Sequence, residues 1–317
     1  MARLILIDSN ALIHRSFHAI PPLTTRKGEL INAVYGFTSI LLRVIKELNP
    51  DYIAATFDLA APTFRHIEYA GYKAKRVKAP DELYEQIPRT KEVLKAFNIP
   101  VLEKEGFEAD DIIGTIAKKL GKGDIEILII TGDLDTLQLI DKNIRVYTPK
   151  KGLIDTIIYG EKEVEERYGL KVSQMIDYKA LRGDPSDNIP GVKGIGEKGA
   201  CNLLKEFGTL ENLYKKLDKL TEKQIIDSPA LSKSVVEKLK TNKQMAIFSK
   251  KLATIHLKVP IKIILKELDW QKKYDIDKIK VLFNELNFQT LIRRLPGFTD
   301  PSIGETGVVE DKQQNLL

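Results

Sequence analysis

Three short apolar runs that each lead into an aspartate constrain the fold more than any other feature of this sequence. The runs are Leu4–Ile7, Tyr52–Phe57 and Ile125–Ile130, and they have the length and the residue types of buried β-strands. Helical patterns separate them, which predicts an α/β fold whose parallel sheet carries helices on both faces. The carboxyl ends of parallel strands share one edge, where ligands bind. The aspartates at these ends are therefore expected to converge: Asp8, Asp58 and Asp133.

Six more acidic residues lie in segments that this topology brings to the same edge: Glu108, Asp110, Asp111, Asp135, Asp184 and Asp187. Each group alone has an ordinary explanation, because acids cap helices and form turns. Nine acids together repel one another unless a cation lies among them. All-oxygen donors suit Mg²⁺ or Mn²⁺. Two such ions about 3.5–4 Å apart can activate water and clamp a phosphodiester, which predicts a phosphate-ester hydrolase.

The charge balance favours a polyanionic substrate. The chain has 50 Lys and Arg against 44 Asp and Glu, and setting the nine acids aside leaves 35 acids, an excess of 15 positive charges. A single cysteine, Cys201, argues against a disulfide framework and against a cysteine-rich zinc site. We find no apolar run long enough to cross a membrane and no secretory signal, so a cytoplasmic location is expected.

Two segments have the composition of nucleic-acid contacts. Residues 62–78 interleave aromatic and basic side chains, as in single-strand grooves, although a solvated surface loop has the same composition. Their basic residues, with Lys73 the first choice, can polarise a phosphate: Arg65, Lys73, Lys75, Arg76 and Lys78. Residues 191–200 resemble the glycine-rich turn of a helix-hairpin-helix, which binds phosphate through backbone N–H groups, although a tight turn explains the glycines equally well. The candidate residues there are Gly191, Lys193, Gly194, Gly196, Lys198 and Gly199.

The chain is expected to form two domains and a tail. Residues 1–168 are expected to form the α/β domain, with an excursion over residues 62–78, and residues 169–298 a mainly helical domain. Helices are predicted at Asp81–Phe97, Ala109–Leu120, Ser173–Arg182, Gly196–Phe207, Leu210–Leu217, Leu231–Phe248 and Ile276–Leu286, with a short strand at Lys262–Ile264. Residues 299–317 have little to bury and are expected to be a flexible tail or linker.

A series of motifs over residues 1–296 carries a family resemblance. They are Leu6-Ile-Asp-Ser-Asn, Asn32-Ala-Val-Tyr-Gly-Phe, Phe57-Asp with Ala61-Pro-Thr-Phe-Arg-His, Gly71-Tyr-Lys-Ala-Lys-Arg, Glu108-Ala-Asp-Asp-Ile-Ile-Gly, Thr131-Gly-Asp-Leu-Asp, and Gly183-Asp-Pro-Ser-Asp-Asn-Ile-Pro-Gly-Val-Lys-Gly-Ile-Gly-Glu-Lys. In this order they resemble the 5′ nuclease (5′-3′ exonuclease) domain of bacterial DNA polymerase I, in the flap endonuclease family. The resemblance implies a Rossmann-like (PIN-like) sheet, a helical arch over residues 62–97 and a helix-three-turn-helix DNA-binding domain.

The resemblance also implies roles for individual residues. Asp8, Asp58, Glu108 and Asp110 would hold the first metal ion, and the other five acids would serve the second ion or its surroundings. Tyr72, Lys73 and Arg76 match the arch motif, whose lysine assists the scissile phosphate. The turn at 191–199 would hold duplex DNA, with a K⁺ ion at its carbonyls. Two positions depart from the family pattern: Leu134 stands where Lys or Arg is usual, and Gly199 where Thr is common.

The implied reaction is hydrolysis of DNA and of RNA primers near a single-strand/duplex junction, at 5′ flaps or nicks, in replication and repair at the bacterial nucleoid. A polymerase region would follow in the same chain, and a free-standing exonuclease is the alternative. Other readings of the acids are a PIN-like ribonuclease, a catalytically silent DNA-binding protein and a structural Ca²⁺ site. The glycine hairpin argues against the first, the intact acid set against the second, and the surrounding positive charge against the third.

Overall fold

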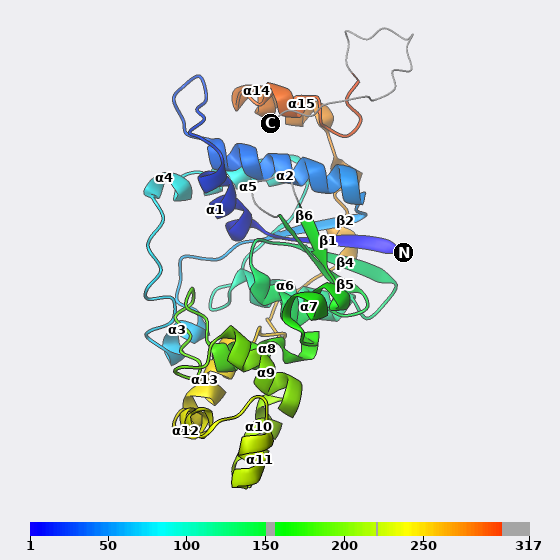
Figure 1. Cartoon of the computed structure of the whole chain (residues 1–317). Coiled ribbons are helices and arrows are strands. Elements are labelled where there is room, and N and C mark those ends of the chain that lie inside the picture. Colours follow the sequence, from blue (N-terminus) through cyan, green and yellow to red (C-terminus); the bar gives the residue numbers. More distant parts are fainter. Residues whose placement is uncertain (150–155, 220, 300–317) are drawn as a thin grey trace, which may run out of the picture.

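A six-stranded sheet forms the centre of the molecule (Figure 1). The computed structural model describes residues 1–149, 156–219 and 221–299. The strands lie in the order β3-β2-β1-β4-β5-β6, parallel except for the antiparallel pair β5–β6. Their bounds are β1 Ala2–Asp8, β2 Tyr52–Thr56, β3 Val101–Leu102, β4 Ile125–Ile130, β5 Ile144–Pro149 and β6 Thr156–Tyr159. The three strands expected from the apolar runs are confirmed as the neighbours β2, β1 and β4.

Both faces of the sheet are buried because its strands are apolar at successive positions. Leu4 and Leu6 of β1 belong to one core cluster, and Ile5 and Ile7 belong to the other. Side chains alternate between faces along a strand, so a continuous apolar run supplies two cores at once. The helices predicted on both faces of a parallel sheet are confirmed.

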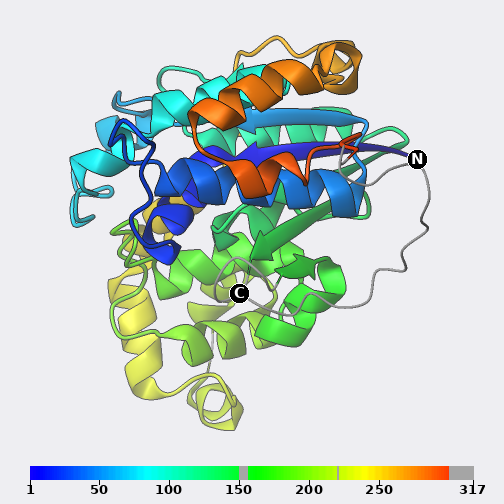
Figure 2. The same ribbon diagram turned by 90° about the horizontal axis from the view of Figure 1, so that it is seen from above.

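One face is covered by helices from both ends of the described chain (Figure 2). They are α1 Ser9–Ala19, α2 Asn32–Leu48, α5 Ile87–Ala96, α14 Ile276–Glu285 and α15 Gln289–Ile292. Phe283 and Phe288 are fully buried in the same cluster as Val34 and Phe37 of α2. We expected residues 169–298 to form one unit, but the chain returns after the helical domain and packs its last helices on α2 and α5. The apolar face of α14 is completed by the first domain, not by its neighbours in sequence.

The other face is covered by α6 Ala109–Leu120 and α7 Glu161–Tyr168 and by a module of shorter helices. These are α8 Met175–Arg182, α9 Glu197–Phe207, α10 Leu210–Leu217, α11 Glu222–Asp227, α12 Lys233–Thr241 and α13 Lys243–Ala253, with 3₁₀ turns at Val172–Gln174, Leu265–Leu268 and Gln271–Lys273. Tyr178 and Leu181 of α8 belong to the same cluster as Ile127 and Ile129 of β4. The helical module therefore shares its core with the sheet.

Several helix boundaries differ from those expected. The helix predicted at 81–97 is interrupted at Gln86, which divides α4 Asp81–Tyr84 from α5. Gln86 instead uses its side chain, accepting from Ala33 N–H (2.8 Å) and donating to Asn32 (3.1 Å). Asn242 similarly separates α12 from α13.

The strand predicted at Lys262–Ile264 is wrong. Ile261 and Ile263 pack against the core at alternate positions, but the segment has no strand pairing. Alternating apolar residues therefore indicated that one side of this segment is buried, but they did not show that it pairs with a neighbouring strand. The tail expected at 299–317 lies outside the described residues beyond Thr299. Within the described part of the chain, no helix has the length and apolarity that crossing a bilayer requires.

Candidate active site

The ends of three adjacent strands bring acidic side chains to one edge of the sheet. Asp8 is the last residue of β1 and pairs in register with Thr56 of β2, two residues before Asp58. Ile7 pairs with Ile130 of β4, three residues before Asp133. Since the strands end level with one another, these three carboxylates border a single pocket, and their predicted convergence is confirmed.

The N-terminus of α6 also lines this pocket, through Ala109 and Asp110. Asp58 accepts a hydrogen bond from Ala109 N–H (2.7 Å), which holds the helix start against the end of β2. Asp110 in the first helical turn lines the same cavity as Asp8 and Asp133, which has a volume of about 240 Å³. We call Asp8, Asp58, Asp110 and Asp133 the open carboxylates, because none lies within ion-pair distance of a described Lys or Arg.

Burial and mutual repulsion raise the pKa of three of the open carboxylates, Asp8, Asp110 and Asp133. Burial raises the pKa of Asp8 to about 7, against the hydrogen bond that Thr131 donates to it (2.6 Å), and the charge of Asp58 adds to the rise. Burial and the charges of Asp133 and Asp8 raise the pKa of Asp110 well above its ordinary value. Burial also raises the pKa of Asp133, although Lys179 opposes this. Such a pocket is stabilised by protons or by a cation.

The other five acids are each paired with a basic side chain of the protein. Arg65 binds Asp111 through two hydrogen bonds of 2.8 Å. Lys73 donates to Glu108 (2.7 Å), and Arg76 donates to Asp187 (2.5 Å). Lys179 bridges the remaining two acids, Asp135 and Asp184. Burial alone would raise the pKa of Asp184, but the charge and hydrogen bond of Lys179 lower it to about 2.

These pairings divide the nine acids expected to serve metal ions into two sets. Among residues 1–149, 156–219 and 221–299, no three acidic, His or Cys side chains stand in position to hold a metal ion as they are. The open carboxylates nonetheless fit a hard divalent cation, because they present oxygen donors without a compensating charge. The five paired acids can bind the metal ions only if they first release the Lys and Arg side chains that now hold them.

Two residues expected to contact nucleic acid are buried instead. Arg65 is 3% exposed, and besides Asp111 it donates to the carbonyls of Leu252 and Thr254 (2.9 Å each). Tyr72 is 4% exposed, and its hydroxyl donates to Glu108 and Asp187 (3.0 Å each). In the structure, Arg65 and Tyr72 are therefore occupied by acids of the protein, and their contact with DNA stays a prediction. The composition of residues 62–78 is typical of a nucleic-acid surface, but both of these side chains bind acidic residues of the protein itself.

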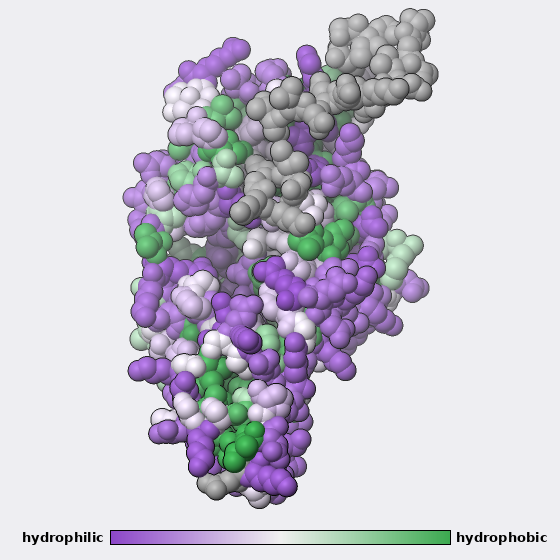
Figure 3. Space-filling model, in the orientation of Figure 1, coloured by the Kyte–Doolittle hydropathy of each residue, from purple (hydrophilic) through white to green (hydrophobic). Residues whose placement is uncertain are grey.

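The rest of the basic segment borders the pocket on its open side. After α3 Phe64–Glu68 the chain runs to α4 along one side of the molecule (Figure 1), and the surface is hollowed beside it (Figure 3). Lys73 has a positive φ of 55°, and its N–H donates to the carbonyl of Asp187 (2.9 Å). Lys75 and Arg76 are exposed and line a neighbouring recess of about 630 Å³. Lys73, Lys75 and Arg76 thus lie between the open carboxylates and solvent.

The glycine hairpin forms a tight turn between α8 and α9. Gly191 has a φ of 64°, and a Cβ there would lie 2.3 Å from the backbone nitrogen of Gly183. Its N–H donates to the Ser249 hydroxyl (2.9 Å), which ties the turn to α13. The exposed side chains of Lys193 and Lys198 lie on the turn and on the first turn of α9. A Cβ at Gly199 would meet only Ile195, at 3.4 Å, so the missing Thr is tolerated by the local packing.

Four residues of the site were missed by sequence reasoning. Asn10 accepts from Asp58 N–H (3.1 Å), Thr131 donates to Asp8, and His14 lines the pocket beside them. Asn10 and Thr131 lie within two residues of Asp8 and Asp133, which was the available signal. Lys179 lies in the middle of α8, five residues before Asp184, and nothing in the sequence distinguishes it from a surface lysine. Leu134, beside these acids, is partly buried against the core.

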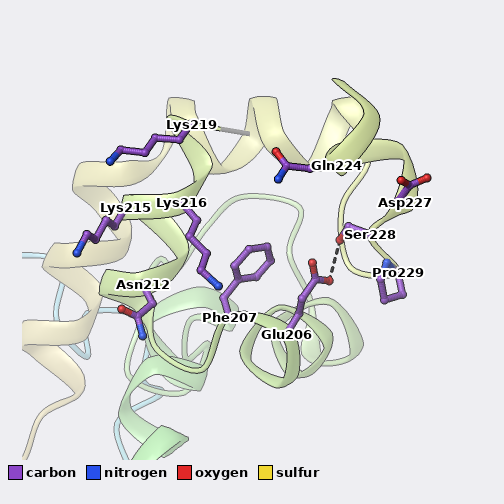
Figure 4. A pocket seen from close by; sticks show the side chains of 10 residues that line it. All are labelled: Glu206, Phe207, Asn212, Lys215, Lys216, Lys219, Gln224, Asp227, Ser228 and Pro229. Carbon is purple, nitrogen blue, oxygen red and sulfur yellow. Dashed lines mark hydrogen bonds between the residues drawn. The ribbon is translucent and has the colours of Figure 1, made fainter. Parts of the chain in front are cut away.

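A larger cavity of about 830 Å³ lies in the helical module, between α10 and the loop after α11 (Figure 4). Lys215, Lys216 and Lys219 line one side of it. Glu206 accepts from the Ser228 hydroxyl (2.7 Å) on the other side. None of the open carboxylates borders it, so it is separate from the site at the sheet edge.

Comparison with known families matches nearly the whole described chain. Residues 3–169 match the family described as 5′-3′ exonuclease, N-terminal resolvase-like domain, and residues 170–275 match 5′-3′ exonuclease, C-terminal SAM fold. DNA polymerase I of Caldicellulosiruptor bescii is 42% identical over 92% of this chain, and that of Bacillus subtilis is 39% identical over 99%. The alignments cover 33% and 34% of those proteins, so the chain spans about a third of their length.

Solved structures share the fold at lower identity. The T5 5′-exonuclease with bound zinc ions superposes with a TM-score of 0.65 at 20% identity, over 90% of this chain and 98% of that one. The catalytic core of Rad2 in complex with a DNA substrate superposes with a TM-score of 0.56 at 17% identity, over 93% of each chain. These likenesses support the sheet and helical module described above.

Proposed function

Because the chain belongs to the 5′-3′ exonuclease family, we propose that its open carboxylates are the centre of a structure-specific nuclease that cuts DNA near a single-strand/duplex junction. The observation that carries the proposal is the pocket of four carboxylates without a protein cation, bordered by Lys73 and Arg76. Excess negative charge inside and positive charge at the rim suit a cation-dependent reaction on a polyanion. Substrates of this class are 5′ flaps, nicks and RNA primers on DNA.

The open carboxylates are the proposed first ligands of two Mg²⁺ ions, which Mn²⁺ can replace. All four line the same pocket: Asp8, Asp58, Asp110 and Asp133. When bound, such ions lower the pKa of water and neutralise charge on the phosphate. Glu108, Asp111, Asp135, Asp184 and Asp187 would join the ions or orient their waters once the ion pairs with basic side chains exchange.

The chain's own cations have separate proposed roles. Lys73 and Arg76 are the proposed catalytic contacts to the scissile phosphate, because they border the pocket and each already binds an anionic group there. Exposed Lys75 would follow the single strand. The hairpin at Gly191, Gly194 and Gly196 would bind the duplex backbone, aided by Lys193 and Lys198 and by a K⁺ ion at its carbonyls.

The relatives suggest the larger setting. The DNA polymerase I proteins that match are about three times as long as the matching region, so we propose that a polymerase region can follow this chain. The nuclease would then remove RNA primers and damaged 5′ ends ahead of synthesis, in cytoplasm at the bacterial nucleoid.

The proposal is tested with a flap duplex labelled once at the 5′ end and once at the 3′ end, so that the cut is located from both sides. We expect cleavage with Mg²⁺ near the junction, lost with EDTA and in Asp110→Asn. Asp124→Asn, which makes the same change at an exposed position in the turn between α6 and β4, is the matched control and should cut normally. Tight binding without cleavage in Mg²⁺ and in Mn²⁺ would refute the enzymatic role and leave a structure-specific DNA-binding protein.

A further inference from the structure

A groove of about 700 Å³ lies at the end of the sheet opposite the carboxylates. Its walls include Lys46 and Asn49 at the end of α2, Trp270 and Tyr274 before α14, and Arg293 and Arg294 after α15. Trp270 donates its indole N–H to the carbonyl of Pro50 (3.0 Å), two residues before β2 begins. We call it the return groove, because the returning C-terminal helices create it.

The return groove has a positive charge that the described residues do not neutralise. Lys46 and Arg293 are exposed, and neither lies within ion-pair distance of a described carboxylate. Arg294 donates to the hydroxyl and the carbonyl of Ser39 (2.7 and 2.8 Å), both uncharged acceptors. Three cations beside an aromatic and aliphatic floor suit an anionic partner that also carries apolar side chains.

The chain itself continues from the rim of this groove with such a sequence. Gly297 lines the groove, and the described chain reaches Thr299 two residues later. Residues 300–311 contain four acidic residues and no basic one: Asp300, Glu305, Glu310 and Asp311. Ile303, Val308 and Val309 lie between them. Twelve residues reach up to about 40 Å when extended, which is ample for a groove at their own attachment point.

We propose that the return groove binds residues 300–311 of the same chain. The charges are complementary, and the tether supplies an effective concentration in the millimolar range, so weak contacts suffice. In relatives three times as long, a docked segment here would fix the direction in which the following part leaves the nuclease.

Trp270 gives a direct test, because it is the only Trp in the sequence and yields one indole N–H resonance. A nitroxide label is attached at Gly307→Cys in the full chain, in a Cys201→Ser background. We expect the label to broaden the Trp270 resonance at low salt. The broadening should be lost at high salt, in Lys46→Glu/Arg293→Glu, and when the four acids of residues 300–311 are changed to Asn or Gln.

Controls separate docking from mere attachment nearby. Lys122→Glu/Lys142→Glu makes the same charge change at exposed positions at the edge of β4 and β5 and should leave the broadening intact. Combining Lys46→Glu/Arg293→Glu with Lys at the four acidic positions should restore it. If the Trp270 resonance is still broadened at high salt and in Lys46→Glu/Arg293→Glu, the proposal is overturned. It is also overturned by a Trp270 resonance that is moved by an added single-stranded oligonucleotide but not by changes to residues 300–311, because the groove is then a nucleic-acid surface.

Discussion

Replacing Arg65 by Met tests how the molecule holds the carboxylate edge of its sheet together. The Arg65 guanidinium joins three parts of the chain: α3, the start of α6 through Asp111, and the carbonyls of Leu252 and Thr254 at the end of α13. Asp111 is fully buried and also accepts from His256 N–H (2.7 Å). Removing the guanidinium therefore leaves a carboxylate inside the protein without its cation.

The magnitude follows from that buried charge. Breaking a buried ion pair by removing one partner costs about 3–5 kcal/mol. With a urea dependence of about 3 kcal/mol per M, a loss of about 4 kcal/mol lowers the unfolding midpoint by about 1.3 M. Because Asp111 lies next to Asp110, we also expect cleavage to fall in Arg65→Met while the fold is still populated.

The assay is urea unfolding followed by circular dichroism, with two further variants. Arg65→Met/Asp111→Leu should recover most of the lost free energy, since no unpaired charge remains. Arg89→Met removes an equally well-paired cation whose partners Glu29, Glu92 and Glu285 are 37%, 49% and 49% exposed, and it should cost below about 1 kcal/mol. If Arg65→Met costs no more than Arg89→Met, or if the double variant is as unstable as the single one, the reasoning is refuted.

Three further predictions concern separate features. Asp110→Asn should lower kcat by more than about 100-fold, because even the loss of an outer partner of a metal site has an effect approaching this size. Without metal it should raise the thermal unfolding midpoint, because it removes one of four carboxylates that repel one another. An unchanged midpoint would contradict the repulsion. Gly191→Ala should destabilise the chain and weaken duplex binding in a gel-shift assay, because its Cβ would clash with the backbone of Gly183. Gly208→Ala has a φ of 80° but open space around it, so it should cost only the strain of the left-handed backbone, about 1–2 kcal/mol. The hydrogen bond from Lys250 lowers the pKa of Glu211 below its ordinary 4.5, so this pair stabilises the fold above that pH and is lost as the pH falls through the lowered value. The urea midpoints of Glu211→Gln and the parent should therefore differ at pH 7 and converge as the pH falls below the lowered pKa of Glu211.

The sheet and its acidic edge could be predicted because they depend on local pattern and topology. Apolar runs long enough for both faces of a sheet identified β1, β2 and β4, and parallel strands must end at a common edge. The strand β3 escaped notice because it has only two residues, Val101 and Leu102, and exists by pairing with β2. The helix break at Gln86 also escaped, since it depends on the contacts of Gln86 with Asn32 and Ala33. The break at Asn242 is local, because the Asn242 side chain donates to the carbonyl of Lys238 in the preceding turn.

The sequence by itself determined that acids would gather at the carboxyl end of the sheet, because strand order and the helix start at Ala109 bring them there. Tertiary structure alone decided which acids stay unpaired. Arg65, Lys73 and Arg76 lie 46, 35 and 111 residues from the carboxylates they bind, and local sequence cannot specify such pairs. The partner of a buried carboxylate is the basic side chain that the fold brings next to it. Which side chain this is depends on the packing between distant segments. The same packing returned α14 and α15 to the first domain and made the groove beside Trp270.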